Sequence, residues 1–232
     1  MTNLCVIYDL DGTLVDSEGL CNQAFLDLLP ELADTVELLV HRYRGMKLAQ
    51  ILADIEHCLD RKLPKNFESR YRERVAELFE RELKPMPGVY AMLASTDYPR
   101  CVASSGPRAK IRQALEISGL ATFFNGNIFS SYEVGSWKPE PGLFLHAAET
   151  MGFFPKHCVV VEDSIVGIEA AAAARMRALL YVPKGGYSVY SAAITFNDMS
   201  DLPRLLEQFA ADMASDAQQM HAPDALSRAG DT

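Results

Sequence analysis

The stretch LCVIYDLDGTL, residues 4–14, joins a short apolar run to two carboxylates and a glycine. Residues 4–8 are apolar or β-forming, and a short run of this kind that ends at polar residues and glycine predicts a buried strand. Asp9 and Asp11 follow at once, and their spacing points both carboxylates the same way if the backbone stays extended. Gly12 permits a sharp turn directly behind them. The stretch therefore predicts a strand whose carboxyl end presents two acids.

This pair of acids is a candidate site for a hard cation. Clustered carboxylates are costly unless a cation lies between them, and oxygen ligands of this kind suit Mg²⁺. The alternative is an ordinary strand-to-loop turn, because Asp and Gly are common in such turns. The pair by itself leaves both interpretations open.

Similar apolar runs recur along the chain and alternate with helical patterns. Strands that alternate with helices of about 10–15 residues are typical of βαβ units and a parallel sheet. The runs are apolar on both faces, as expected for strands that helices cover on both sides. The predicted fold class is α/β, with a Rossmann-like doubly wound parallel sheet. The predicted strands span residues 4–8, 100–103, 127–129, 158–161 and 178–182, and the later helices span 107–118, 141–151 and 164–175.

The segment between the first two predicted strands breaks this alternation. It contains no convincing strand, and its apolar residues recur with helical spacing. Pro85, Pro87 and Gly88 mark the return to the alternating pattern. An all-helical insertion within an α/β domain is the simplest account. We therefore expect a catalytic core of residues 1–16 and 87–210, a helical insertion of residues 17–86, and a flexible tail of residues 211–232.

Composition and charge exclude several classes of protein. Hydrophobic residues make up 49% of the 232 residues and charged residues 23%, which excludes a disordered chain. The 22 basic and 31 acidic residues give a net charge of −9, and such a surface would repel a nucleic-acid backbone. No uninterrupted apolar run reaches roughly 18 residues, so we expect no membrane-spanning helix.

The cysteines and the N-terminal residues bear on the compartment. The five cysteines are odd in number and form no C-x-x-C pair, which favours a reducing compartment over a disulfide framework. The first residues, MTNLCVIYDLDG, lack the basic start and longer apolar stretch of a signal peptide. We therefore expect a cytoplasmic protein.

Three further groups of polar residues follow predicted strands. Ser104 and Ser105 precede Gly106 and a helix, where hydroxyl and backbone N–H groups bind phosphate well, although a plain helix cap is the alternative. Lys138 stands in SWKPEP, where a solvated surface lysine is the alternative.

Glu162 and Asp163 follow the fourth predicted strand and form a second acidic pair. Alone they are compatible with a helix N-terminus, where acids are favourable. Open α/β sheets bind ligands at the carboxyl ends of their strands, so we expect all these groups to meet at one edge. Acids, hydroxyls and one cation together supply a nucleophile, a proton shuttle, metal ligands and a charge neutraliser. The combination predicts metal-assisted phosphoryl transfer.

These motifs resemble those of the haloacid dehalogenase superfamily of phosphotransferases, from Leu4 to about Pro183. The helical insertion resembles the α-helical cap of the subfamily that includes phosphoglycolate phosphatase, β-phosphoglucomutase and sugar-phosphate phosphatases. Within this subfamily, the overall sequence most resembles that of 6-phosphogluconate phosphatase-like enzymes. The motifs are DLDGTLVDS (9–17), VASSGP (102–107), SWKPEP (136–141) and VVVEDSIVGIEAA (159–171), and the cap stretch is RYRGMKLAQI (42–51).

The resemblance implies a role for each core residue. Asp9 would attack phosphorus and form an aspartyl-phosphate, and Asp11 would serve as proton donor and then as base. Ser104, Ser105 and Lys138 would contact phosphoryl oxygens. Asp9, the backbone carbonyl of Asp11 and Asp163 would hold Mg²⁺, with Glu162 bound directly or through water. The implied activity is hydrolysis of a small phosphorylated metabolite by a monomer or weak homo-oligomer.

The resemblance also places substrate recognition in the cap. Arg44, Gly45 and Lys47 form an elbow between helices of the kind that faces the core in this subfamily. Two cations there would suit a sugar acid phosphate, and a solvated helix end is the alternative. Tyr132 and Trp137 are more typical of packing than of substrate contact.

Three other functions remain open. A phosphomutase is disfavoured, because Cys21 stands where β-phosphoglucomutase has a histidine twelve positions after its nucleophile. A non-catalytic phosphate-binding protein would usually have lost Asp9, Asp11 or Lys138, and all three are present. A metal-free dehalogenase would not need Asp11.

Overall fold

The computed structural model describes residues 4–183 and 193–220 and contains one six-stranded parallel sheet. The strand order is β3-β2-β1-β4-β5-β6, so the order reverses beside β1, where ligands bind in open α/β sheets. The sheet confirms the predicted α/β fold class. The strands are β1 (Cys5–Tyr8), β2 (Arg100–Ser104), β3 (Ile128–Ser130), β4 (Cys158–Glu162), β5 (Arg177–Tyr181) and β6 (Ile194–Phe196).

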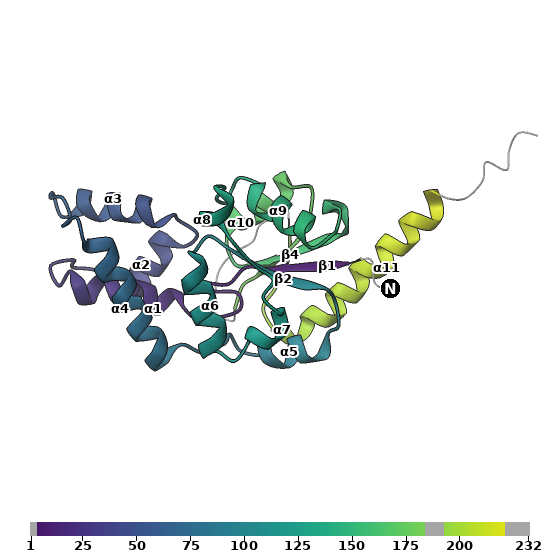
Figure 1. Cartoon of the computed structure of the whole chain (residues 1–232), viewed down its shortest axis with the longest axis horizontal. Helices are drawn as coiled ribbons and strands as arrows, with labels where there is room; N and C mark the ends of the chain where they lie inside the picture. Colours follow the sequence, from purple (N-terminus) through teal and green to yellow (C-terminus); the bar gives the residue numbers. More distant parts are fainter. Residues whose placement is uncertain (1–3, 184–192, 221–232) are drawn as a thin grey trace, which may run out of the picture.

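Helices cover both faces of this sheet, as the doubly apolar strands require (Figure 1). Alternate residues of each strand point to opposite faces, so Val6 and Tyr8 pack in one cluster and Cys5 and Ile7 in another. The first cluster contains residues of α5 (Val89–Ser95), α6 (Arg108–Ile117), α7 (Ala121–Phe124) and α11 (Leu202–Met220). The second contains residues of α9 (Gly142–Thr150) and α10 (Ile165–Ala173), and the short helix α8 (Ser131–Val134) precedes α9.

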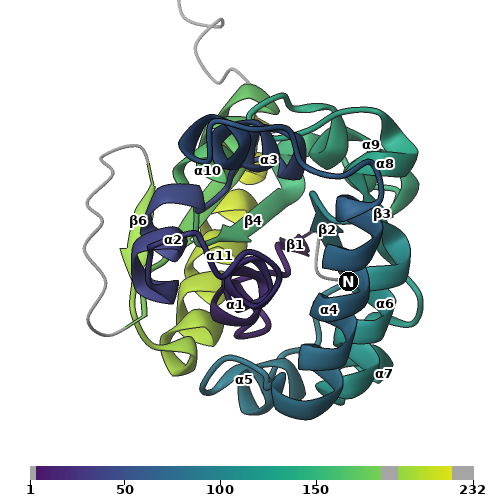
Figure 2. The ribbon, with the colours of Figure 1, turned by 90° about the vertical axis from the view of Figure 1, so that its left-hand side faces the viewer.

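The helical insertion lies at one end of the molecule (Figures 1 and 2). It contains α1 (Glu18–Leu28), α2 (Val36–Tyr43), α3 (Leu48–Cys58) and α4 (Phe67–Glu82). Two chain segments connect the insertion to the sheet domain, and they run side by side. The N–H of Asp16 donates to the Lys84 carbonyl at 2.9 Å. The N–H of Met86 likewise donates to the Leu14 carbonyl at 2.9 Å. The insertion is therefore attached through one narrow pair of segments.

Two elements differ from the sequence prediction. Strand β6 was not predicted, because it is three residues long and its first two residues are exposed at the sheet edge. Helix α11 continues through residues 211–220, which the sequence prediction assigned to the flexible tail. Helix-forming residues fill this stretch, Met213 packs against the core, and Arg177 pairs with Asp212 at 3.0 Å. Residues 221–232 of that tail lie outside the described part of the chain.

None of the helices in residues 4–183 and 193–220 combines the length and the apolar character that crossing a membrane requires.

Candidate active site

The sheet brings the predicted acids together because their strands are neighbours. Tyr8, the last residue of β1, pairs with Val161 of β4, and the next backbone N–H, from Asp9, donates to the Val161 carbonyl at 2.9 Å. Asp9 thus leaves the sheet beside Glu162 and Asp163. Ser104 ends β2, which lies on the other side of β1.

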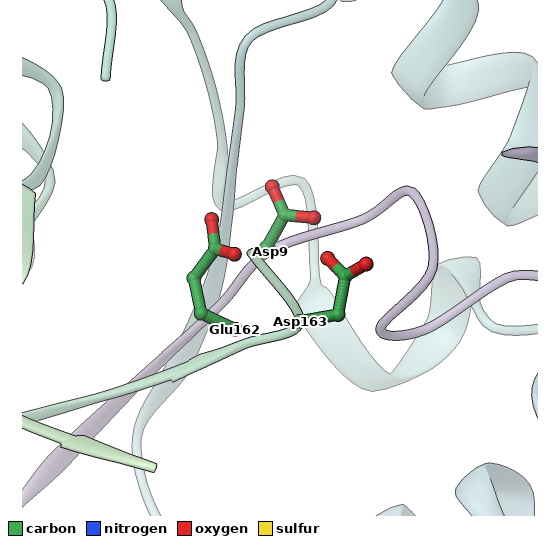
Figure 3. A group of neighbouring side chains, drawn as sticks. All are labelled: Asp9, Glu162 and Asp163. Atoms are coloured by element: carbon green, nitrogen blue, oxygen red, sulfur yellow. The ribbon is translucent and has the colours of Figure 1, made fainter. Parts of the chain in front are cut away.

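Asp9, Glu162 and Asp163 form one buried acidic cluster (Figure 3). Each offers a carboxylate oxygen, and these oxygens lie within 4.8 Å of one another. Burial raises the pKa of Asp9 to about 7, although Lys138 opposes the rise. Burial, with the nearby Glu18 and Glu162, raises the pKa of Asp163 well above its usual range. Hard oxygen ligands under mutual repulsion fit a divalent cation such as Mg²⁺.

Lys138 is the cation closest to this cluster. Its Nζ donates to Asp9 Oδ1 at 2.5 Å and to Glu162 Oε1 at 2.6 Å. Burial lowers the pKa of Lys138, but Asp9 and Glu162 outweigh it and hold the pKa above its ordinary value. The other oxygen of Glu162 accepts from the N–H and the hydroxyl of Ser164, each at 2.8 Å. Ser164 therefore holds Glu162 in place, and Glu162 in turn positions the ammonium of Lys138.

Two glycines allow the segments around the cluster to approach closely. A Cβ on Gly167, in the first turns of α10, would lie 1.9 Å from Cδ of Glu162. A Cβ on Gly12 would lie 2.4 Å from Oδ2 of Asp163, and Gly12 has a φ of +77°. A side chain at either position would displace an acid of the cluster.

Asp11 lies apart from the acidic cluster and has its own partners. Its Oδ1 accepts from Ser17 Oγ at 2.5 Å and from Lys110 Nζ at 2.8 Å. Burial raises the pKa of Asp11, but Lys110 and Ser17 outweigh it and lower the pKa below its usual value. Lys110 was not singled out in the sequence. It is 99 positions from Asp11, and a lysine in the first turn of a charged helix carries no distinguishing signal.

The two serines lie where β2 meets α6. Ser104 is buried, and its Oγ accepts from the N–H of Gly106 at 3.0 Å. Ser105 and Gly106 line a cavity beside Asp11. The turn presents hydroxyl and N–H groups at the start of a helix, which is a suitable cradle for phosphate oxygens.

The three predicted cap residues take different positions. Arg44 donates to Glu18 of α1 at 2.8 Å and approaches Asp163 Oδ2 at 3.8 Å, so it links the insertion to the acidic cluster. Gly45 has a φ of +74°, and a Cβ there would lie 2.6 Å from Val166 of α10. The ammonium of Lys47 lies over the ring of Trp137, 5.3 Å from its centroid.

A cavity of about 550 Å³ separates the helical insertion from the sheet's carboxyl edge. Asp11, Ser105, Arg44 and Lys47 all line it. Sequence reasoning missed most of its lining, because the residues lie on six helices and the loops between them. From the insertion it is lined among others by Phe25, Tyr43, Ile51, Tyr71 and Arg72, and from the sheet side by Lys110, Gln113, Tyr132 and Trp137.

Comparison with known proteins identifies relatives along nearly the whole chain. A model of the haloacid dehalogenase-like hydrolase family matches residues 4–175. The 6-phosphogluconate phosphatase of Escherichia coli (strain K12) is 34% identical over 207 residues, which cover 86% of this chain and 93% of that enzyme. The residues that the family model matches span every motif of the carboxyl edge.

Solved structures show the same architecture. A haloacid dehalogenase-like protein from Agrobacterium tumefaciens is 32% identical, with a TM-score of 0.76, over 90% of this chain and 98% of its own. A candidate β-phosphoglucomutase from Thermotoga maritima is 26% identical, with a TM-score of 0.70, over 88% and 99%. This chain belongs to the haloacid dehalogenase-like hydrolase family and is a phosphatase enzyme.

Proposed function

We propose that the chain is a Mg²⁺-dependent phosphatase that hydrolyses a small phosphorylated sugar or sugar acid, such as 6-phosphogluconate, through an aspartyl-phosphate. One observation carries the proposal: Asp9, Glu162, Asp163 and Lys138 converge in a buried cluster. Arg44, which lines the cavity, approaches Asp163 of this cluster at 3.8 Å. The likeness to the Escherichia coli 6-phosphogluconate phosphatase supports the choice of substrate class.

In the proposed mechanism, Asp9 is the nucleophile. A carboxylate oxygen of Asp9 attacks phosphorus, the new P–O bond forms, and the electron pair of the breaking P–O bond stays on the leaving oxygen. Lys138 and the Ser104–Ser105 turn neutralise the phosphoryl oxygens. Asp9, Asp163, the backbone carbonyl of Asp11 and, directly or through water, Glu162 would hold Mg²⁺. When bound, Mg²⁺ would supply charge neutralisation at the phosphoryl group.

Asp11 is the proposed proton shuttle. It gives a proton to the leaving oxygen in the first step and takes one from the attacking water in the second, which restores both carboxyl groups. The helical insertion, residues 17–86, is the proposed cap that excludes bulk water and reads the rest of the substrate. Of its predicted contacts, Lys47 lines the cavity over Trp137, while Arg44 is engaged by Glu18.

A phosphomutase is the second candidate, and the likeness to the Thermotoga maritima structure favours it. A mutase must protect its aspartyl-phosphate from water and requires a bisphosphate activator. Cys21 lines the cavity at the position where β-phosphoglucomutase carries histidine, which favours the phosphatase.

Phosphate release from a panel of substrates tests the proposal. The panel holds sugar phosphates, sugar acid phosphates, phosphoglycolate and nucleoside monophosphates, each with Mg²⁺ and with EDTA, and Asp9→Asn is the control. We expect Mg²⁺-dependent release that is highest for sugar or sugar acid phosphates and absent in Asp9→Asn. Turnover that needs a bisphosphate and releases no net phosphate would favour the mutase.

A further inference from the structure

In the described part of the chain, side chains hold the carboxylate of Asp11 on one side only. Ser17 Oγ and Lys110 Nζ reach it from different elements, and both donate to the same oxygen, Oδ1. Ser17 precedes α1, and Lys110 lies on α6 of the sheet domain. Asp11 also lines the cavity, so its second oxygen, Oδ2, is the one left for a substrate.

The position of Lys110 indicates that it serves Asp11. Its ammonium lies 5.6 Å from the centroid of the Phe79 ring of α4, and its side chain is 22% exposed. A lysine in such surroundings is costly unless its charge is paired, and its ion pair is with Asp11. Two other cavity cations pair with other acids, Arg44 with Glu18 and Arg72 with Glu68.

We propose that Lys110 is a positioning residue that, together with Ser17, holds the Asp11 carboxyl by Oδ1 and so turns Oδ2 toward the substrate. Two donors from different elements fix the orientation of the carboxyl group, and they leave Oδ2 as the oxygen that can exchange a proton with the leaving group. The inference rests on the proposed function. As the bond from phosphorus to the leaving oxygen breaks, the Oδ2 proton moves to that oxygen, and Asp11 is left as a carboxylate whose charge Lys110 pairs.

This role predicts a dependence on the leaving group. An alkoxide from a sugar phosphate is a poor leaving group and needs the proton, whereas p-nitrophenolate leaves readily without it. The ratio kcat/KM covers the steps up to formation of the aspartyl-phosphate, so it reports this first proton transfer. A general disturbance of the site would lower kcat/KM for both substrates alike.

The test compares Lys110→Met with the wild type, using the sugar phosphate hydrolysed fastest in the panel and p-nitrophenyl phosphate. We expect Lys110→Met to lose at least about thirtyfold in kcat/KM on the sugar phosphate and less than about threefold on p-nitrophenyl phosphate. Lys110→Arg retains a donor and should recover most of the loss. Ser17→Ala, which removes the other donor, should show the same selectivity on a smaller scale.

Lys62→Met is the matched control, because Lys62 is 88% exposed on the insertion and pairs with Glu56. Its kcat/KM should stay within about twofold of the wild type on both substrates. Equal losses on the two substrates, or no loss in a folded Lys110→Met, would overturn the positioning role. If Lys110→Met does not fold, the selectivity of Ser17→Ala decides the question in the same way.

Failure of the proposed function gives a different result. In that case the wild type itself shows no Mg²⁺-dependent release from either substrate, or Asp9→Asn retains it, and the role of Lys110 falls with the mechanism. A different outcome would overturn the role of Lys110 and leave the proposed function intact. In that outcome the wild type is active, Asp9→Asn is inactive, and Lys110→Met shows no leaving-group selectivity.

Discussion

The ammonium of Lys138 lies between the carboxylates of Asp9 and Glu162, and its position depends on both acids. A buried ammonium between two carboxylates is compensated only while all three side chains keep their places. Glu162 is fixed by Ser164, so the position of Lys138 depends on the turn that begins α10. The glycine that lets this turn approach Glu162 is therefore as important as the charged groups.

Gly167→Ala should disrupt the cluster, because the added Cβ would lie 1.9 Å from Cδ of Glu162. We expect the free energy of unfolding to fall by about 1–3 kcal/mol. Displacement of Glu162 would also move Lys138, so we expect kcat to fall at least about tenfold. Chemical denaturation and phosphate-release assays measure the two effects.

The matched control is Gly19→Ala in α1. Its Cβ would meet Val36 at 3.9 Å, an ordinary contact. A helical glycine with such room should be stabilised by up to about 1 kcal/mol when replaced by alanine, with kcat unchanged. If the two variants had the same stability and kcat, the predicted clash between a Cβ at position 167 and Glu162 would be contradicted.

The acidic cluster should link the stability of the protein to pH and metal. Burial raises the pKa of Asp9 to about 7 and that of Asp163 above its usual range, so these two acids hold more protons in the folded protein than in the unfolded chain. In EDTA, the contribution of these two acids to stability is therefore most favourable at about pH 4 and below, and it is lost as the pH rises toward 7. Mg²⁺ should restore stability at the higher pH, because it binds the deprotonated acids of the folded state.

Asp163→Asn removes one of these acids, and urea titrations between pH 5 and 8 measure the consequence. We expect a shallower decline of stability in EDTA, little stabilisation by Mg²⁺, and turnover lowered at least about a hundredfold. Full activity and unchanged Mg²⁺ affinity in this variant would refute the role of Asp163 as a metal ligand.

At the scale of elements, helix α11 belongs to the core of the sheet domain. Its residues Leu202 and Leu206 are completely buried in the cluster that contains β1 and β4. The spacing of four places them on one face of the helix. The helix therefore covers one face of the sheet and forms part of the hydrophobic core.

Leu206→Ala should cost about 2–5 kcal/mol in the free energy of unfolding, because it removes a fully buried side chain and leaves a cavity. The exposed Glu207 of the same helix provides the control, and Glu207→Ala should change stability by less than about 0.5 kcal/mol. Denaturant titrations compare the two. A cost below about 1 kcal/mol for Leu206→Ala would show that α11 does not cover the sheet.

At the scale of the whole molecule, two cations and two aromatic rings connect the insertion to the sheet domain. Arg72 of α4 donates to the hydroxyl of Tyr132 at 3.0 Å, and Lys47 lies over Trp137. The two rings meet edge to face, with centroids 5.6 Å apart. All four residues line the cavity, and Trp137 directly precedes Lys138. The contacts that join the insertion to the sheet domain over the cavity therefore include the residue next to Lys138.

Arg72→Ala should weaken the contacts between the insertion and the sheet domain, because it removes the hydrogen bond to Tyr132. We expect KM to rise about three- to tenfold with a smaller change in kcat, because the contact stabilises the closed arrangement more than the chemical step. Trp137 is the single tryptophan of the chain, so its fluorescence should change when Mg²⁺ and phosphate are added, and change less in Arg72→Ala. Arg81→Ala, an exposed position on the same helix, is the control. A fall in kcat at unchanged KM would contradict this role.

The sequence by itself determined the fold class and predicted the acids that the sheet brings together. Short apolar runs that stop at Asp9, Ser104 and Glu162 predict buried strands and also the edge at which their ends meet. The reason is physical: parallel strands joined by helices present all their carboxyl ends on one side. The helical periodicity of the insertion was likewise readable, because one apolar face recurs every three to four residues.

Only the tertiary structure decided which groups pair. Lys110 with Asp11, Arg44 with Asp163 and Arg72 with Tyr132 join segments far apart in the chain. Each of these cations resembles any solvated surface charge until packing brings it to its partner. Local patterns record backbone preference and burial, whereas ion pairs depend on distances that the whole fold sets.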